Sequence, residues 1–440
     1  MSGRPLPVVC GTVLVAALIA VGLLTTPQTR ADNVSLYHEG IGLTAAGALA
    51  TIPTGETPRY LAGTRVLAPD PGANEDAIAA AEHLAEETRT WLAAGTLPGA
   101  GTPFADLGHD ALLDLHALLR GGGGAIAGAS TAWRYVWPRD AAFIAAALSA
   151  TSHHHDAFEI LDYLQAVQAP DGSFHARYTV AEQLPPDDRG TQTDGTGWGL
   201  WALAQATDTV GTDRERDALL TRFAPLIERS TTFLLAQVSD RSPLPAPSSD
   251  YWEHRETQVT LGTAAPVLAG LEAAARLHDL RGDTGNATRS TAAAEALREA
   301  ITERFGTFGY GRYPGRSLQD AAASFVLPPF VAEPLPGAAT AWRASIETMT
   351  RPGGGLAPGA AWPETQYSWT PQTALYAWTA ASLGDRTRAI EMLDWLDNHR
   401  TTTGAIPEKV GPDGAPAAVA PLAWTCALVL LTLVALEQNP

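Results

Sequence analysis

Cysteine is almost absent from this chain. Only Cys10 and Cys426 occur among its 440 residues. Cys10 lies in an apolar N-terminal run, and Cys426 lies in a late apolar segment, where we expect it to be a small buried hydrophobic side chain. This shortage excludes a disulfide framework and a zinc site built from cysteines.

Positive charge is the second deficit. Lys and Arg number 29 against 47 Asp and Glu, which gives a formal net charge of −18. A nucleic-acid-binding face needs clustered basic residues because it must neutralise phosphates. We therefore expect no nucleic-acid partner, and a neutral substrate fits the chain better than an anionic one.

The N-terminus has the pattern of an export signal. Arg4 precedes an unbroken run of apolar or small residues at 8–24, and Thr29-Arg30-Ala31 has the small-x-small form of a cleavage site. Residues 1–31 are therefore predicted to be a signal peptide or, if they are not cleaved, an N-terminal membrane anchor. The first interpretation predicts a secreted protein, and the second predicts one attached to the cell surface through this segment.

Alternating strand patterns are nearly absent after residue 70, and alanine- and leucine-rich helical stretches replace them. Clusters of Gly and Pro separate these stretches. We therefore predict an all-α fold in which residues 71–440 form one domain and residues 32–70 are irregular. The predicted helices are 75–94, 109–120, 139–149, 155–168, 195–207, 213–237, 257–280, 290–304, 370–383, 386–398 and 421–436.

A loop bearing an aromatic or an acidic residue runs directly into a helix six times, roughly once every 55–60 residues. Such a period fits two helices and two loops, so it predicts six helical hairpins that close into an (α/α)6 barrel, with an open solenoid as the alternative. In the barrel the six loops meet at one end. The residues that mark them are Trp137, Asp194, Glu253, Asp320, Trp369 and Trp424.

Tryptophan and carboxylates gather on these loops. A tryptophan offers a flat apolar face and one N–H donor, which together suit a sugar ring. Two carboxylates from distant loops are what hydrolysis of a glycosidic bond requires, and Glu253 and Glu408 are the candidates. We expect the apolar rim to favour protonated Glu253 and Lys409 to favour ionised Glu408. The tryptophans are Trp133, Trp137, Trp198, Trp252, Trp362, Trp369 and Trp424.

The motifs YVWPRDAAF, DYWE, GRYPGRSLQDAAASFVLPP and GAIPEKVGPDGAPAAVAPLAWTCA occur in this order over residues 75–437. In this the chain resembles glycoside hydrolase family 15, the glucoamylases, glucodextranases and their relatives. The resemblance implies an (α/α)6 catalytic domain that performs inverting exo-hydrolysis of α-glucosides without a cofactor or metal. It implies that Glu253 is the general acid and Glu408 the general base. It also implies that Arg139 and Asp140 clamp sugar hydroxyls, and that Trp137 and Trp252 line the same subsite.

The chain departs from the family pattern at four places. His254 stands where a second carboxylate is usual, Lys409 follows the base in place of Gln, and no Arg follows the Gly-Gly-Leu stretch near Ala357. Trp133 occupies the position of a Tyr near the attacking water. These changes favour a short or differently linked glucoside, of isomaltose or trehalose type, over starch.

Two further interpretations follow from these departures and from the remaining rim residues. The alternative function is a carbohydrate-binding protein on the same barrel with impaired catalysis. In either case the ligand is an oligosaccharide or polysaccharide, and we expect a monomer. Trp133, Asp194, His254 and Trp369 complete the predicted substrate-binding set.

The run of His153, His154 and His155 is predicted to start a helix and not to bind a metal, because adjacent helical side chains point in different directions.

Overall fold

The computed structural model describes residues 36–120, 124–239 and 243–438. The predicted signal or anchor segment, 1–31, lies outside the described residues. Within the part of the chain that is described, no helix is both long enough and apolar enough to cross a membrane. The described residues from Tyr37 onward belong to one compact unit.

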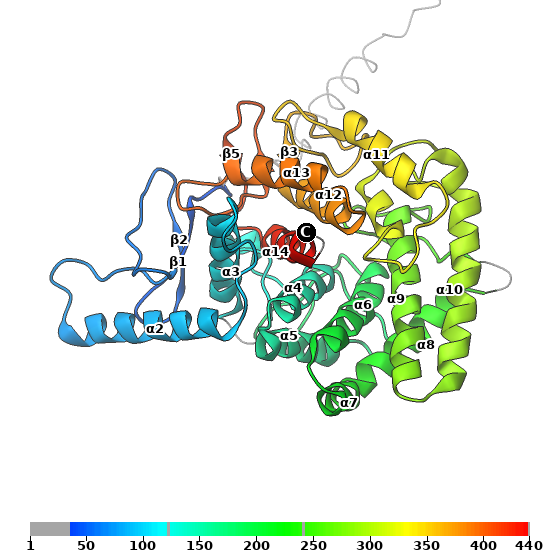
Figure 1. Cartoon of the computed structure of the whole chain (residues 1–440), viewed down its shortest axis with the longest axis horizontal. Helices are drawn as coiled ribbons and strands as arrows, with labels where there is room; N and C mark the ends of the chain where they lie inside the picture. Colours follow the sequence, from blue (N-terminus) through cyan, green and yellow to red (C-terminus); the bar gives the residue numbers. More distant parts are fainter. Residues whose placement is uncertain (1–35, 121–123, 240–242, 439–440) are drawn as a thin grey trace, which may run out of the picture. The chain divides into compact units, whose positions relative to one another are not determined.

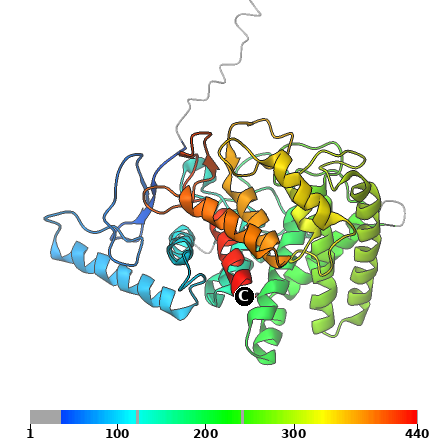
Figure 2. The ribbon, with the colours of Figure 1, turned by 45° about the horizontal axis from the view of Figure 1, so that its top comes forward.

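A short hairpin precedes the helices. Strands β1 (Gly40–Leu43) and β2 (Leu49–Ile52) pair antiparallel, with Gly40 opposite Ile52, so the segment predicted to be irregular contains regular structure. The hairpin and helix α2 (Glu75–Ala94) lie at one side of the barrel (Figure 1 and Figure 2). Arg65, which follows the hairpin, is buried and donates to Asp114 at 2.6 Å, and thereby ties this segment to the barrel.

Six elements form a closed inner ring, in which each packs against the next and the last packs against the first. Their residues are almost all buried, and alanine and glycine are frequent among them, so neighbouring backbones can lie close together. The closure confirms the predicted barrel and excludes the open solenoid. The inner elements are α4 (Pro138–Ala150), α6 (Asp194–Thr209), α9 (Leu261–Leu280), the 3-10 helix η3 (Ala321–Val326), α12 (Thr370–Ser382) and α14 (Ala423–Gln438).

The outer layer alternates with the inner ring along the chain (Figure 1). It contains α11, which the sequence pattern did not predict. The predicted helix 213–237 is two helices, α7 and α8. The division falls at Phe223, because Pro225 can only occupy the first turn of a new helix. The outer elements are α3 (Ala105–Leu119), α5 (His154–Val167), α7 (Asp213–Arg222), α8 (Ala224–Gln237), α10 (Thr284–Arg304), α11 (Ala338–Met349) and α13 (Arg386–Asn398).

Short elements connect the loops at the end of the barrel where the inner helices begin. Strand β4 (Lys409–Val410) lies between β3 (Ser368–Trp369) and β5 (Pro416–Ala417) in a small antiparallel sheet. This sheet places Trp369 directly opposite Lys409, the residue that follows Glu408. Two further 3-10 helices are η1 (Thr131–Trp133) and η2 (Gly306–Phe308).

The contact between α6 and α9 depends on two glycines. A Cβ added to Gly197 would lie 2.0 Å from the carbonyl oxygen of Pro266, and a Cβ on Gly270 would lie 2.6 Å from the Cα of Gly197. Both neighbours are backbone atoms, so they cannot rotate away. A Cβ added to Gly199, two residues along α6, would have its nearest neighbour, the side-chain Cε2 of Phe174, at 4.0 Å.

We expect Gly197→Ala to lower the free energy of unfolding by about 1–3 kcal/mol or more, because the added methyl group forces the two inner helices apart. Gly199→Ala is the matched control, and it should be neutral or raise that free energy by up to about 1 kcal/mol, since alanine favours the helix. Urea unfolding followed by circular dichroism measures both. Equal effects of the two substitutions would contradict the close α6–α9 contact.

Candidate active site

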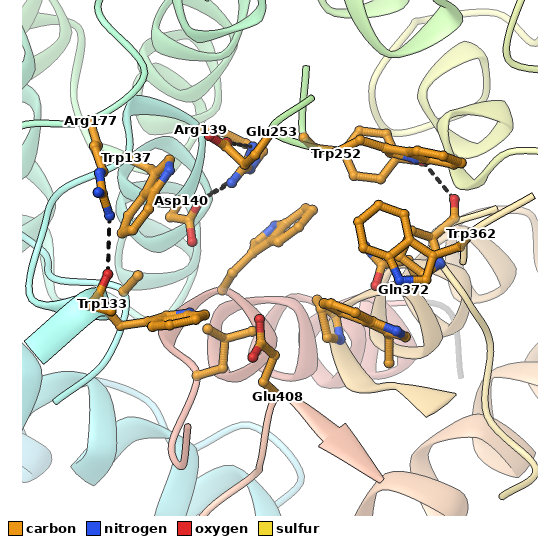
Figure 3. Close-up of a pocket in the computed structure, with 18 of the residues that line it drawn as sticks. Trp133, Trp137, Arg139, Asp140, Arg177, Trp252, Glu253, Trp362, Gln372 and Glu408 are labelled. Carbon is orange, nitrogen blue, oxygen red and sulfur yellow. Dashed lines mark hydrogen bonds and ion pairs between the residues drawn. The ribbon is translucent and has the colours of Figure 1, made fainter. Parts of the chain in front are cut away.

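The loops that enter the inner helices surround a pocket of about 320 Å³. Its volume is within the range of pockets that hold small ligands. Figure 3 shows Glu253 and Glu408 on opposite sides of it. Residues that line the pocket include Trp133, Trp137, Arg139, Asp140, Arg177, Arg189, Tyr251, Trp252, Glu253, Trp362, Trp369, Gln372, Glu408 and Trp424.

Eight of the ten predicted site residues line this pocket, and two do not. Asp194 lies beneath it at the start of α6, where it is 1% exposed and burial raises its pKa to about 8. His254 is exposed and stacks on Trp362, with ring centroids 5.3 Å apart. Among the predicted rim tryptophans, Trp198 is a core residue that packs against Phe325.

The backbone at Glu253 has an unusual conformation. Its φ is +57°, a left-handed value that a non-glycine residue seldom adopts. The turn is fixed by Asp250, whose carbonyl accepts from the Glu253 amide at 2.8 Å and whose side chain accepts from the Trp252 amide at 2.9 Å. Such backbone strain is common at functional sites, where the surrounding structure must stabilise the unfavourable conformation.

The surroundings of the Glu253 carboxylate differ from the apolar ones that the sequence predicted. Arg139 donates to its Oε1 at 3.3 Å, while Arg189 and Gln192 donate to its Oε2 at 3.1 and 3.0 Å. Two guanidinium groups and one amide therefore surround this carboxylate with hydrogen-bond donors. The sequence showed no periodic pattern that would have placed Arg189 or Gln192 here.

A buried ionic cluster supports the loop that carries Glu253. Arg312 is 1% exposed and donates to Asp320 at 3.1 Å, to Asp250 at 3.0 Å and to Glu256 at 2.6 Å. Its guanidinium also lies 3.8 Å from the ring centroid of Trp252. Arg312 thus holds the backbone turn and the tryptophan together from below.

The tyrosine of the Asp-Tyr-Trp-Glu motif belongs to the same support. The hydroxyl of Tyr251 donates to Asp320 at 2.5 Å and lies 2.8 Å from the carbonyl oxygen of Pro358. Burial raises the pKa of Asp320, although the positive charge of Arg312 opposes this. Tyr251 therefore connects the loop of Glu253 to the two loops that follow it in the barrel.

Glu408 has the opposite environment to Glu253. Its backbone is held on both sides, since its amide donates to Val419 at 2.8 Å and its carbonyl accepts from the amide of Thr370 at 3.0 Å. Its side chain is buried, and within the described part of the chain no group donates a hydrogen bond to its carboxylate. Burial raises the pKa of Glu408 to about 7.

Nearby charges also affect the pKa of Glu408. The positive charge of Lys409 lowers the pKa of Glu408, as the sequence predicted, whereas the negative charges of Glu364 and Asp140 raise it. Lys409 itself pairs with Glu364 at 2.7 Å and lies 4.2 Å from the ring centroid of Trp369. Its ammonium group is therefore paired with Glu364 and acts on Glu408 only through its charge.

Arg139 and Asp140 face the pocket as a pair. Arg139 Nη2 lies 2.9 Å from Asp140 Oδ2, and the guanidinium lies 4.9 Å from the ring centroid of Trp424. Burial raises the pKa of Asp140, and the charge of Arg139 opposes that shift. This pair presents both a charged donor and an acceptor to a ligand.

Several buried polar atoms in the pocket wall have no hydrogen-bond partner among the described residues. Buried polar groups are normally satisfied, so these atoms are suited to bind the hydroxyl groups of a ligand. Five are indole N–H groups, and one is an amide oxygen that the sequence did not single out. They belong to Trp137, Trp252, Trp362, Trp369, Trp424 and Gln372.

One group of side chains away from the pocket has metal-ligand spacing. The ligand atoms of His155, Asp156 and Glu159 on α5 lie within 4.8 Å of one another. His155 and Glu159 are exposed, and Asp156 already accepts a hydrogen bond from the indole of Trp91 at 2.8 Å. Nothing connects this group with the pocket.

Comparisons with known proteins confirm the resemblance to glycoside hydrolase family 15, although no family model matches the chain. An isomaltose glucohydrolase of Kribbella flavida is 26% identical over 334 residues, which cover 69% of this chain and 83% of that protein. The structure of a wild-type glycosidase matches with a TM-score of 0.64 and 23% identity, over 76% of this chain and 97% of its own. A bacterial glucoamylase complexed with acarbose matches with a TM-score of 0.62 and 17% identity, over 84% of this chain and 62% of its own. These structural matches establish the shared barrel.

We expect Arg312→Gln to lower the free energy of unfolding by about 3–5 kcal/mol, because it leaves three buried carboxylates without their counter-charge. Arg316→Gln, an exposed change four residues away, is the control and should alter stability by less than about 0.5 kcal/mol. Denaturant unfolding followed by tryptophan fluorescence tests both. A change of under about 1 kcal/mol for Arg312→Gln would contradict the supporting role of the cluster.

Proposed function

From this resemblance to glycoside hydrolase family 15, we propose that the protein is an exported enzyme that hydrolyses α-glucosidic bonds from the chain end with inversion at the anomeric carbon. Its class, a glucoamylase-like glycoside hydrolase, is the one shared by the relative and the structural neighbours. The observation that carries the proposal is that two glutamates from distant loops, Glu253 and Glu408, line one pocket. Hydrolysis of a glycosidic bond requires such a pair of carboxyl groups.

The pocket fits a neutral sugar. Three arginines line it, Arg139, Arg177 and Arg189, and three carboxylates balance them when all are ionised. Indole faces and unpartnered N–H groups supply apolar and polar contacts side by side. A single pocket of about 320 Å³ receives the end of a sugar chain more readily than its middle.

The reaction assigns one role to each glutamate. Glu253 gives its proton to the glycosidic oxygen while the bond from that oxygen to C1 breaks. Glu408 takes a proton from a water molecule, and the water oxygen forms the new bond to C1 from the opposite face. The products are glucose and the free alcohol, and the proton gained by Glu408 returns to Glu253 through solvent. We expect the two carboxyl groups to be about 6.5–9.5 Å apart, so that the water fits between them.

We propose a short α-glucoside as the substrate, with an α-1,6 linkage as the leading candidate. The isomaltose glucohydrolase among the relatives supports this, as do the departures from the family pattern at His254 and Lys409. Trehalose-type linkage and a binding protein with impaired catalysis are the alternatives. The presence of both glutamates in one pocket favours an active enzyme over the binding protein.

We expect the wild-type protein to release β-glucose from one or more members of a panel of α-1,4, α-1,6 and α,α-1,1 glucosides. Glu253→Gln and Glu408→Gln should each lower kcat by about 10²–10⁴-fold or more, because each removes a proton-transfer group. Proton NMR of the fresh product identifies the anomer. Glu299→Gln, a change on the exposed face of α10, is the control.

Three results would count against the proposal. Release of the α-anomer would indicate retention and exclude the water-activating role of Glu408. Full activity in either glutamine variant would exclude that residue as acid or base. Binding of the panel sugars without turnover would support the carbohydrate-binding alternative.

The pH dependence follows from the raised pKa of Glu408. As a base it must be ionised, so kcat/KM should fall as the pH decreases through about 7. Glu364→Gln removes a negative charge, lowers the pKa of Glu408 and moves this acidic limb to lower pH. Lys409→Met removes a positive charge, raises that pKa and moves the limb to higher pH. Shifts in the same direction for both variants would contradict the assignment of the limb to Glu408.

A further inference from the structure

A loop of residues 177–192 reaches the proton-donor side of the pocket and places Arg189 on Glu253. Arg189 and Arg177 both line the pocket, and Arg189 Nη1 donates to Glu253 Oε2 at 3.1 Å. The following inference rests on the proposed role of Glu253 as general acid.

The hydrogen bonds of Glu253 conflict with that role in the free protein. Oε2 accepts from both Arg189 and Gln192, and Oε1 accepts from Arg139. A carboxyl group that protonates a glycosidic oxygen must carry a proton and direct it at the substrate. The two donors on Oε2 take up its lone pairs, so that oxygen cannot carry a proton toward the substrate. At least one donor must leave before Glu253 can act.

Arg189 is the donor that is free to leave. The side chain of Arg139 is only 8% exposed and is bound to Asp140, and Gln192 is 5% exposed. The side chain of Arg189 is 40% exposed, and its Nε already lies 3.3 Å from Asp187 Oδ2. A second carboxylate is therefore within reach of the guanidinium without movement of the backbone.

Other contacts hold Asp187 in a position where it can pair with the guanidinium of Arg189. Arg177 pairs with Asp187 and donates to the carbonyl oxygen of Ala132 at 3.1 Å. The Arg177 guanidinium also lies 4.3 Å from the ring centroid of Tyr135. Burial raises the pKa of Asp187, but hydrogen bonds and charges from Arg177 and Arg189 outweigh this and keep the pKa below its ordinary value.

We propose that Arg189 is a removable hydrogen-bond partner of the general acid, which occupies Oε2 of Glu253 in the free protein and pairs with Asp187 alone when a glucoside enters. With this oxygen vacated, Glu253 directs its proton at the glycosidic oxygen. Arg189 is in this sense a positioning residue, because it acts on Glu253 and not on the bond that breaks.

The other charged groups around Glu253 keep their positions in this exchange. Arg139 and Asp140 face it from α4, Asp194 lies below it on α6, and Asp250 belongs to its own loop. None of these is exposed enough to change partners. A change in KM on substitution of Arg189 at one fixed pH is therefore attributable to Arg189.

The test compares Arg189→Gln and Arg189→Lys with wild type, with Asp188→Asn as the control in the same exposed loop. Arg189→Gln removes the ion pair with Glu253 that an entering glucoside would otherwise have to break. KM should therefore fall about twofold while kcat stays constant, the effect of one partly exposed ion pair. Arg189→Lys should restore the wild-type KM, and Asp188→Asn should not change it.

Two outcomes would overturn the inference. One is an unchanged KM in Arg189→Gln. The other is a rise in KM or a loss of kcat in that variant, which would indicate that Arg189 binds substrate or maintains the loop. Both differ from failure of the proposed function, in which the wild type is inactive or Glu253→Gln retains full activity.

A crystal structure gives a readout that is independent of rate. In the Glu408→Gln variant with isomaltose bound, we expect Arg189 to pair with Asp187 and to lie beyond hydrogen-bond distance from Glu253. Arg189 still bonded to Glu253 in that complex would refute the exchange.

Discussion

The arrangement of the site depends on one buried guanidinium group. Arg312 reaches carboxylates from two different loops of the barrel and lies flat against Trp252. It has no route to water, and three carboxylates surround its single positive charge, so the cluster is stable only with all its members in place. The left-handed turn at Glu253 is possible because this cluster fixes Asp250, which in turn fixes the turn. A conformation that is unfavourable locally is thus maintained by charge interactions below it.

The same support explains why an aromatic pair precedes Glu253. Tyr251 binds the cluster through its hydroxyl, whereas Trp252 covers the guanidinium and lines the pocket with the same ring system. The two residues are adjacent in sequence but have different structural roles. One connects neighbouring loops, and the other separates the buried charges from the ligand.

Much of the fold followed from the sequence, because the repeat of loop and helix is periodic and the inner helices are rich in small residues. The sequence also placed Glu253, Glu408, Arg139 and most of the pocket tryptophans correctly, since each stands at the start of an inner helix or in the loop before it. It failed at η3, where a short 3-10 helix replaces an inner helix and no helical period exists. Trp198 was misplaced because it lies one turn into α6, where the side chain faces the core.

The surroundings of the two glutamates could not be predicted, and the reason is physical. The environment of each carboxyl group depends on partners that are distant in sequence, such as Arg189 for Glu253 and Asp140 for Glu408. In the free protein, hydrogen-bond donors occupy the Glu253 carboxylate, and burial raises the pKa of Glu408. A sugar that enters the pocket changes both conditions, since it can displace a mobile donor from Glu253 and bring a water molecule to Glu408. In this interpretation the ligand itself completes the site, because Glu253 loses a hydrogen-bond partner and becomes available to the glycosidic oxygen only when a sugar is present.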